Sequence, residues 1–220
     1  KGLFPNTKWK KNNLGKGWAL GETLITGIGQ GYIQSTPLQL CMMTAQIANG
    51  GYAIKPKIIV DNNPISYEDA KQSMESGLLF DTNSESLLDK KLFKDKKNIK
   101  IVQEAMFSST NERFGTSYKS RIDDPKYQFA GKTGTAQVKR ISKRERELDL
   151  ELEQIPYKDR DHALYIAYGP YINPRYALSI IVEHGGSGSK AAAPIAKKLF
   201  KLIIDRHELR NKQPNFERIT

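Results

Sequence analysis

Two apolar segments near the C-terminus constrain the fold of this chain most strongly. Residues Ala163 to Gly169 and Tyr176 to Glu183 are rich in branched and aromatic side chains, and the Pro-flanked segment 170–174 separates them. Strands joined by so short a turn pair antiparallel. Residues Tyr127 to Val138 also have strand character. The sequence therefore predicts an antiparallel sheet near the C-terminus.

Capping signals predict a helix earlier in the chain. Thr36 suits the N-cap, Pro37 the first helical position, and Gln39 completes a capping box. We expect this helix to run to about Ala48 and to stop at Asn49-Gly-Gly. Because it is apolar on most faces, it is predicted to be buried on several sides.

Weaker signals place the remaining elements. Residues 1–23 are predicted as loop, 52–60 as a strand interrupted by Pro56, and 61–97 as a surface excursion. Apolar stripes predict a short amphipathic helix around 101–106 and a longer one over about 191–205. Together these elements predict an α+β fold, an antiparallel sheet flanked by helices.

One motif on the strand 127–138 carries chemistry: Lys132-Thr133-Gly134-Thr135. The lysine supplies a fixed positive charge, the threonine hydroxyls can bind a carboxylate, and the glycine lets another segment approach the backbone. Taken alone, the triplet Lys-Thr-Gly favours a strand with an exposed lysine and a glycine bulge over a catalytic motif. Together with Ser-x-x-Lys and Ser-x-Asn, it is a signature of penicillin-binding proteins and class A β-lactamases.

Further motifs in order make the resemblance specific. The chain resembles the class B penicillin-binding proteins, in particular the penicillin-binding protein 2 family, from about Gly17 to Asp205, with 61–97 the weakest part. The segments that carry the resemblance are 27–32, 36–40, 48–51, 131–137 and 183–186. It implies that residues 1–220 are the C-terminal part of a transpeptidase domain with a β-lactamase-like fold.

The resemblance implies a peptidoglycan D,D-transpeptidase that crosslinks stem peptides through a serine acyl-enzyme and is inhibited by β-lactams. Lys132 and Thr135 are implied as catalytic, with the Thr135 backbone N–H in the oxyanion hole. Thr133 and Gly134 are implied as substrate-binding. If this strand is an exposed edge, a peptide substrate can pair with it as an added strand.

The resemblance also implies partners and a location, but no cofactor. The partners are stem peptides, β-lactams and membrane proteins of the elongation complex, including a glycan polymerase. A catalytic domain in the periplasm and an inner-membrane anchor outside this chain are implied. No metal is expected, because His162, His184 and His207 show no ligand spacing. The single cysteine, Cys41, excludes an internal disulfide and is expected to be an inert thiol.

The nucleophile of such an enzyme is not among the motifs above. Ser187-Gly-Ser-Lys190 follows the Lys-Thr-Gly motif, and we expect Ser187 to cap the last helix instead. Ser109-Thr-Asn111 falls within 107–115, expected to be a variable loop. We therefore expect the nucleophile and second motif upstream of Lys1 and no acyl transfer by this chain alone, whether it is a fragment or a truncated gene product.

Three segments near the expected cleft carry weaker hypotheses. The segment 27–31 lacks the ending of a phosphate loop and is expected as a helix-entry loop under the active site. Tyr118 is a candidate for approaching the cleft. The long charged connection 139–162 would overhang the cleft, where it would shape access or bind a partner.

The net charge of +11 raises rival functions. Because no basic segment is interleaved with stacking aromatic residues, a solvated lysine surface explains the charge better than nucleic-acid binding, although attraction to an anionic lipid or polymer stays open. A nucleic-acid binder would show steeply salt-dependent affinity. The other rivals are a β-lactamase or D,D-carboxypeptidase, distinguished by hydrolysis, and a catalytically dead scaffold.

Overall fold

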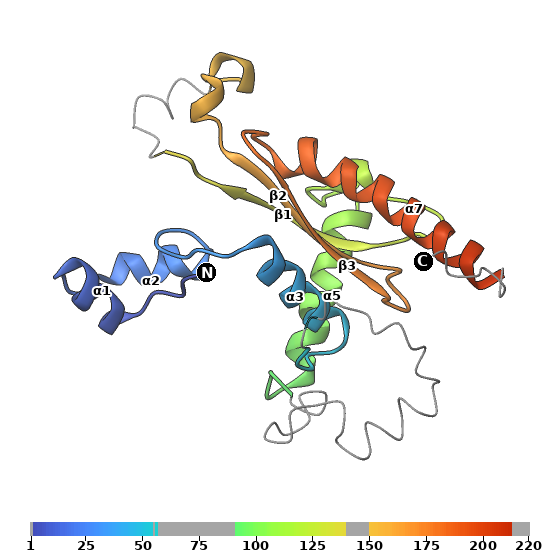
Figure 1. Ribbon diagram of the computed structural model, residues 1–220, viewed down its shortest axis with the longest axis horizontal. Coiled ribbons are helices and arrows are strands. Elements are labelled where there is room, and N and C mark those ends of the chain that lie inside the picture. The colour runs from blue at the N-terminus through green and yellow to red at the C-terminus, as the bar shows by residue number, and fades with distance from the viewer. Residues whose placement is uncertain (1, 55, 57–90, 140–149, 213–220) are drawn as a thin grey trace, which may run out of the picture.

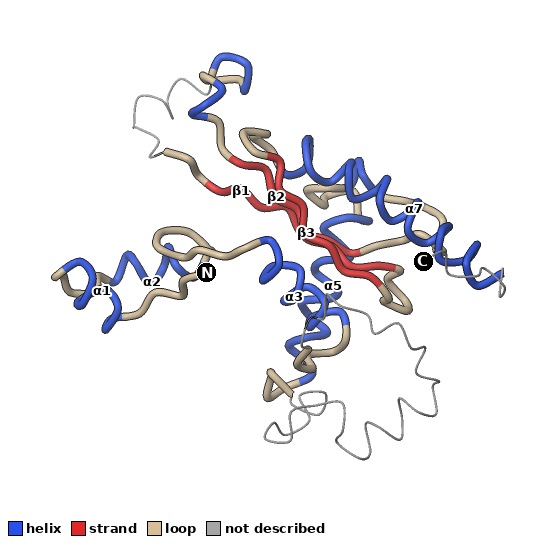
Figure 2. The backbone as a smooth tube through the Cα atoms, viewed as in Figure 1, coloured by secondary structure: helices blue, strands red, loops and turns tan. Residues whose placement is uncertain are grey.

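A computed structural model of the chain describes residues 2–54, 56, 91–139 and 150–212 (Figure 1). Its centre is a three-stranded antiparallel sheet in the order β1 (Ala130–Ala136), β2 (His162–Gly169) and β3 (Tyr176–Val182). Helix α7 (Ala193–Lys212) covers one face, and α3 (Pro37–Ala48) and α5 (Lys96–Asn111) pack on the other (Figure 2). The predicted α+β fold is confirmed.

The sheet places β1 at an edge of the described strands. In the register of the β1–β2 pair, Lys132 lies opposite Ile166 and Thr133 opposite Tyr165. The predicted hairpin of β2 and β3 is confirmed. Strand β1 is shorter than predicted, because the chain turns just before it, where the Tyr127 N–H donates to the Asp124 carbonyl at 3.0 Å.

The main core lies between the sheet and α7. Tyr165 of β2 is fully buried there, and Phe129 stacks on Phe200 with ring centroids 4.9 Å apart. The predicted C-terminal helix is confirmed but extends beyond Asp205, and a π-helical turn, η5 (Gly188–Ala192), precedes it. A Cβ atom on Gly188 would lie 2.4 Å from the Leu164 carbonyl oxygen, so only glycine lets this turn press against β2.

The opposite face holds a smaller cluster. Helix α3 has the predicted bounds and cap: the Thr36 hydroxyl accepts from the Gln39 N–H, and the Gln39 side chain accepts from the Thr36 N–H. Helix α5 is longer than the short helix predicted, because its apolar side chain Met106 packs with Ala130 and Tyr168 of the sheet.

The predicted burial of α3 on several sides is wrong. Within the described residues only Thr44 of this helix is fully buried, while Leu38 and Met43 are 55% and 41% exposed. One face packs on β3 and α5, and the other is open. Of the strand predicted over 52–60, the described residues 52–54 and 56 show an isolated bridge between Tyr52 and Lys91. Residue 55 and residues 57–60, like most of the predicted excursion 61–97, lie outside the described residues.

The loop predicted over residues 1–23 is also wrong, since two short helices form there. Helix α1 (Thr7–Leu14) starts at Asn6, whose side chain accepts from the Trp9 N–H, and α2 (Leu20–Gly27) follows. A Lys10–Glu22 ion pair and the tilted rings of Trp9 and Tyr32, 5.4 Å apart, hold them together. Figure 1 shows this pair extending away from the sheet. None of the helices in the described part of the chain is long and apolar enough to cross a membrane.

Candidate active site

The Lys132-Thr133-Gly134-Thr135 motif lies on the edge strand β1. Lys132 is exposed, and its Nζ donates to the Thr133 carbonyl at 2.8 Å. Within the described residues it forms no ion pair with a carboxylate. The ammonium group is therefore available to a negatively charged ligand.

A groove of about 590 Å³ opens beside Lys132. Apolar side chains of α5 form much of its wall, including Ile101 and Val102, which are 61% and 40% exposed. The hydroxyl side chains of Ser109 and Thr116 also line it. Lys132 thus stands at the border between an apolar groove and the polar edge of the sheet.

A chain of hydroxyl groups connects the motif to α5. The Thr133 and Thr116 hydroxyls are 3.2 Å apart, and the Thr116 hydroxyl is 3.3 Å from that of Ser109. Each contact is within hydrogen-bonding distance. Thr116 therefore positions the Thr133 side chain from the turn that follows α5.

A buried hydroxyl network fixes that turn. The Tyr165 hydroxyl lies 2.9 Å from Ser117 Oγ and 3.0 Å from Thr110 Oγ1, and Ser117 Oγ also donates to the Ser109 carbonyl. Burial raises the pKa of Tyr165, so the network stays protonated at neutral pH. A Cβ atom on Gly115 would lie 2.3 Å from the Ser109 carbonyl oxygen, so the turn needs glycine there.

One side chain from another segment contacts the free edge of β1. Gln30, in the loop after α2, donates its side-chain amide to the Thr135 carbonyl at 3.1 Å. That carbonyl must point away from β2 to be reached, and in an antiparallel strand the N–H of the same residue points to the same side. The Thr135 N–H therefore faces the open edge. The segment 27–31 lies beside the motif.

The two serine motifs within the chain, those of Ser187 and Ser109, lie in different places relative to Lys132. Ser187 does not line the groove beside Lys132 in the described structure, and its Oγ bonds the Ser189 hydroxyl at 2.9 Å instead of capping a backbone N–H, so the predicted side-chain cap is wrong. Ser109 lies on α5, so the loop predicted over 107–115 is wrong at this residue. Its partner in the motif, Asn111, points elsewhere, since its amide donates to the Phe107 and Phe129 carbonyls.

Sequence reasoning missed Thr116 and chose Tyr118 instead. Tyr118 stacks under the Arg121 guanidinium, 4.1 Å from the ring centroid, and lines a different cavity on the α7 side of the turn. Spacing gave no signal for Thr116, because its contact with Thr133 depends on how the turn folds back on α5. The hypothesis for Tyr118 loses its support.

Two of the three histidines meet at the end of the hairpin. The His184 N–H donates to His162 Nδ1 at 2.9 Å, and His184 Nδ1 lies 2.9 Å from the Arg160 carbonyl. His162 begins β2, and His207 lies inside α7. Among the described residues, no three His, Cys, Asp or Glu side chains are grouped to hold a metal ion. For Cys41, burial raises the pKa of the thiol.

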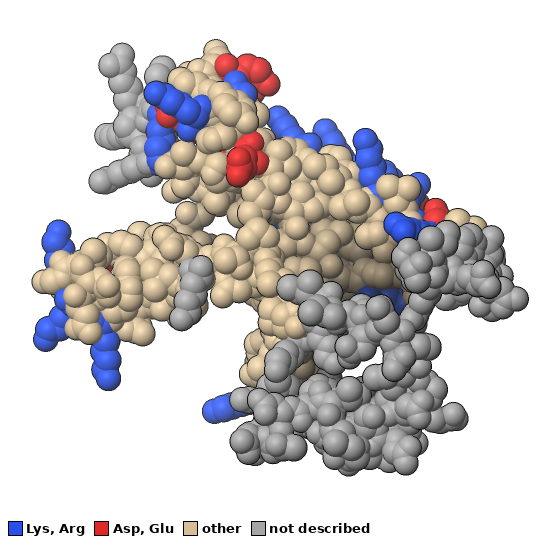
Figure 3. Space-filling model, in the orientation of Figure 1, with Lys and Arg blue, Asp and Glu red and all other residues tan. Residues whose placement is uncertain are grey.

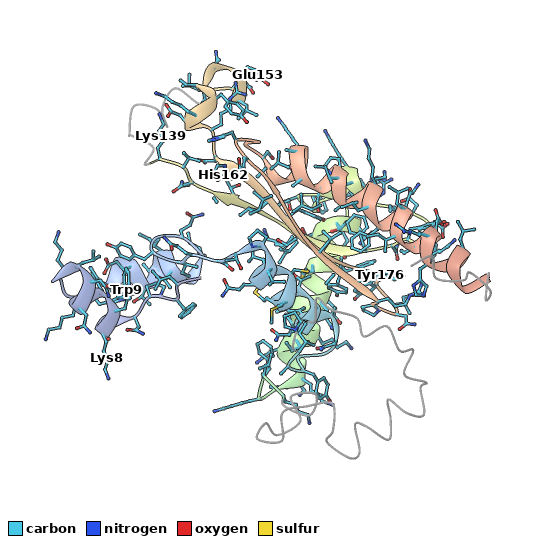
Figure 4. All side chains as sticks on the ribbon, viewed as in Figure 1. Lys8, Trp9, Lys139, Glu153, His162 and Tyr176 are labelled. Carbon is cyan, nitrogen blue, oxygen red and sulfur yellow. The ribbon has the colours of Figure 1, made fainter. Side chains whose placement is uncertain are left out.

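The described part of the connection 139–162 is tied to the sheet at its base. Lys139 pairs with Asp159 at 3.2 Å, and Asp161 accepts from the Val138 N–H at 3.1 Å. Figure 4 shows Lys139 and His162 near the end of β1 and the start of β2, with Glu153 farther out on the connection. Residues 150–161 form two short 3₁₀ turns; residues 140–149 lie outside the described residues.

The sequence of residues 4–201 matches the family described as "Penicillin binding protein transpeptidase domain". The chain belongs to this family. It is 32% identical to the peptidoglycan D,D-transpeptidase MrdA of Salmonella typhimurium over 93% of its own length, and 30% identical to MrdA of Haemophilus influenzae over 92%. It spans about 30% of the length of each of these relatives.

Solved structures agree with this assignment. A crystal structure of penicillin-binding protein 2 of Pseudomonas aeruginosa in complex with WCK 5153 superposes with a TM-score of 0.65 at 32% identity, covering 92% of this chain and 38% of that one. A complex of penicillin-binding protein 2 with MreC from Helicobacter pylori gives 0.64 at 30% identity, covering 94% and 31%. The family named by the sequence motifs is confirmed.

Proposed function

We propose that this chain forms the Lys-Thr-Gly half of the active site of a peptidoglycan D,D-transpeptidase, which crosslinks stem peptides through a serine acyl-enzyme. The observation that carries the proposal is the edge strand β1, with an uncompensated Lys132 ammonium at the groove and the Thr135 N–H at the open edge. The family of the chain supports the same chemistry.

In this reaction a serine attacks the penultimate D-alanine carbonyl, and the terminal D-alanine leaves. The substrate peptide lies along the free edge of β1 as an added strand. The hydroxyls of Thr133 and Thr135 bind its terminal carboxylate, with the positive charge of Lys132 nearby. Because Thr116 already contacts the Thr133 hydroxyl, that side chain is held before the substrate arrives.

The Thr135 N–H donates to the oxyanion that forms when the serine attacks. A fixed backbone donor stabilises this developing charge without reorganisation. The Gln30 amide must move, or stay outside the peptide, when the substrate pairs with the Thr135 carbonyl.

The nucleophilic serine, in this proposal, comes from residues outside the chain and lies in the groove beside Lys132. The apolar wall of the groove, with Ile101 and Val102 exposed, suits the packing of a further helix. Lys132 then assists proton transfer from the serine or its neighbouring base. Neither Ser187 nor Ser109 takes this role.

We further propose that the catalytic domain works in the periplasm and is attached to the inner membrane by an anchor. Its inhibitors are β-lactams, and its partners are proteins of the elongation complex. The complex of a similar protein with MreC supports the last point.

The test is transpeptidation by the full-length gene product on a D-Ala-D-Ala stem peptide with an amine acceptor. The expected result is a crosslinked product together with released D-alanine, both abolished by penicillin. Release of D-alanine without any crosslinked product would identify a carboxypeptidase, and hydrolysis of penicillin with rapid turnover would identify a β-lactamase. Absence of both acylation and turnover would leave a scaffold.

A further inference from the structure

A second cavity, of about 780 Å³, lies on the α7 side of the turn that follows α5. Thirteen residues line it, none of them Asp or Glu, within the described part of the chain. Its basic side chains come from that turn, from η5 and from α7: Arg113, Lys119, Lys190, Lys197, Lys198 and Lys201. Figure 3 shows basic side chains standing in a row along α7.

The acids closest to these cations are engaged mainly elsewhere. On α7, Asp205 and Glu208 pair with Lys126 at 3.3 and 2.7 Å, and Lys201 adds a longer-range attraction to Asp205. In the residues that the structure describes, none of the six basic side chains forms an ion pair. Like charges gathered around a concave surface concentrate a positive field and repel one another until an anion binds.

Two serines with little exposed surface, Ser117 and Ser120, line the cavity. Ser117 is 1% exposed and is held by Tyr165 and by the Ser109 carbonyl. Ser120, 3% exposed, also lines the cavity, and its hydroxyl has no hydrogen-bond partner among the described residues. The Ser120 hydroxyl is therefore free to donate to a ligand oxygen in the cavity.

The geometry points to a binding site for a ligand that carries two or more phosphate groups. A carboxylate brings one negative charge, whereas a phosphate brings up to two charges and three or more acceptor oxygens. Lysine is a point-charge phosphate binder, and arginine adds a two-pronged donor. Six cations and a serine hydroxyl in one cavity therefore match a diphosphate better than a single carboxylate. The cavity adjoins the groove at Lys132, because Gly115 and Thr116 line both. The six basic side chains line the cavity and not the groove.

The test measures binding of inorganic pyrophosphate to the full-length protein by isothermal titration calorimetry. Neutralising two cavity lysines, Lys197→Gln with Lys198→Gln, is expected to weaken binding about tenfold or more, and higher salt to weaken it further. The matched control is Lys96→Gln with Lys97→Gln: the same change in net charge, on two adjacent exposed helical lysines far from the cavity lining. It is expected to leave the affinity unchanged.

Further comparisons fix the class of ligand. Ser120→Ala is expected to weaken pyrophosphate binding a few-fold, and citrate is expected to bind more weakly than pyrophosphate. Vesicles with a phosphate-rich headgroup, compared with free pyrophosphate, distinguish a lipid from a soluble source, and binding to either supports the site. The inference is overturned if pyrophosphate does not bind at millimolar concentration, if citrate binds equally well, or if the control variant loses as much affinity as the cavity variant.

Discussion

Replacing Tyr165 by phenylalanine tests the link between the buried core and the candidate active site. The Tyr165 hydroxyl is the point where Thr110 of α5 and Ser117 of the following turn meet. All three side chains are at most 1% exposed. Removing one oxygen atom therefore breaks two buried contacts and loosens the turn that carries Thr116 against Thr133.

The magnitude follows from the partners that remain. Thr110 keeps two long contacts of 3.4 Å, with the Met106 carbonyl and with Ser117 Oγ, whereas Ser117 keeps a 3.0 Å bond to the Ser109 carbonyl. Each lost buried hydrogen bond contributes about 0.5–1.5 kcal/mol, so the free energy of unfolding should fall by roughly 1–3 kcal/mol. Urea denaturation of the full-length protein measures this change in stability. A second measurement, the rate of penicillin acylation, should also fall.

The same strand offers a matched control in Tyr168→Phe. Tyr168 is 1% exposed, but its hydroxyl is buried without a partner among the described residues. Because removing an unsatisfied buried hydroxyl costs no hydrogen bond, this variant should be as stable as the parent or slightly more stable. Equal destabilisation by the two substitutions would refute the reasoning, since it would show that the network contributes nothing beyond the ring.

Three further predictions concern the motif, the packing and the pH dependence. Lys132→Ala should slow penicillin acylation of the full-length protein roughly 10²–10⁴-fold with unchanged stability, because the side chain is exposed; an unchanged rate would contradict its proposed role. Gly188→Ala should lower the free energy of unfolding by about 1–3 kcal/mol, because its Cβ would collide with the Leu164 carbonyl, whereas Gly17→Ala, with open space around it, should change little; equal effects would count against the close approach of η5. Burial raises the pKa of Tyr165 and of Tyr168, so the unfolded chain loses these protons first and stability should fall as the pH rises above about 10. A double Phe variant should show a shallower fall in the same pH titration, and an unchanged slope would rule these groups out.

Local signals in the sequence were sufficient to predict α3 and the β2–β3 hairpin. The capping box of α3 joins Thr36 and Gln39, which are three residues apart, so the sequence alone predicts it, and the structure contains it. The β2–β3 hairpin is similarly local. Helix α1 was missed because it lacks an apolar stripe, and the Lys10–Glu22 pair and the Trp9–Tyr32 contact that hold α1 and α2 together are tertiary.

The site itself was only half predictable. Lys132 and its neighbours could be found from the motif, but the hydroxyl chain through Thr116 and Ser109 depends on a turn folding back onto α5. Gly115 permits the turn to approach α5 closely, and no pattern of residue spacing predicts this contact. The cationic cavity shows the same limit, because its lysines and arginine come from three separate segments that only the fold brings together.

The most direct test of the proposed function is to map the acylated residue. The full-length gene product is labelled with penicillin, digested and examined by mass spectrometry. The proposal predicts a single acyl adduct on a serine outside residues 1–220, and much slower formation of that adduct in Lys132→Ala. An adduct on Ser187 or Ser109 would contradict it, because the nucleophile would then lie within this chain and the groove beside Lys132 would have another purpose.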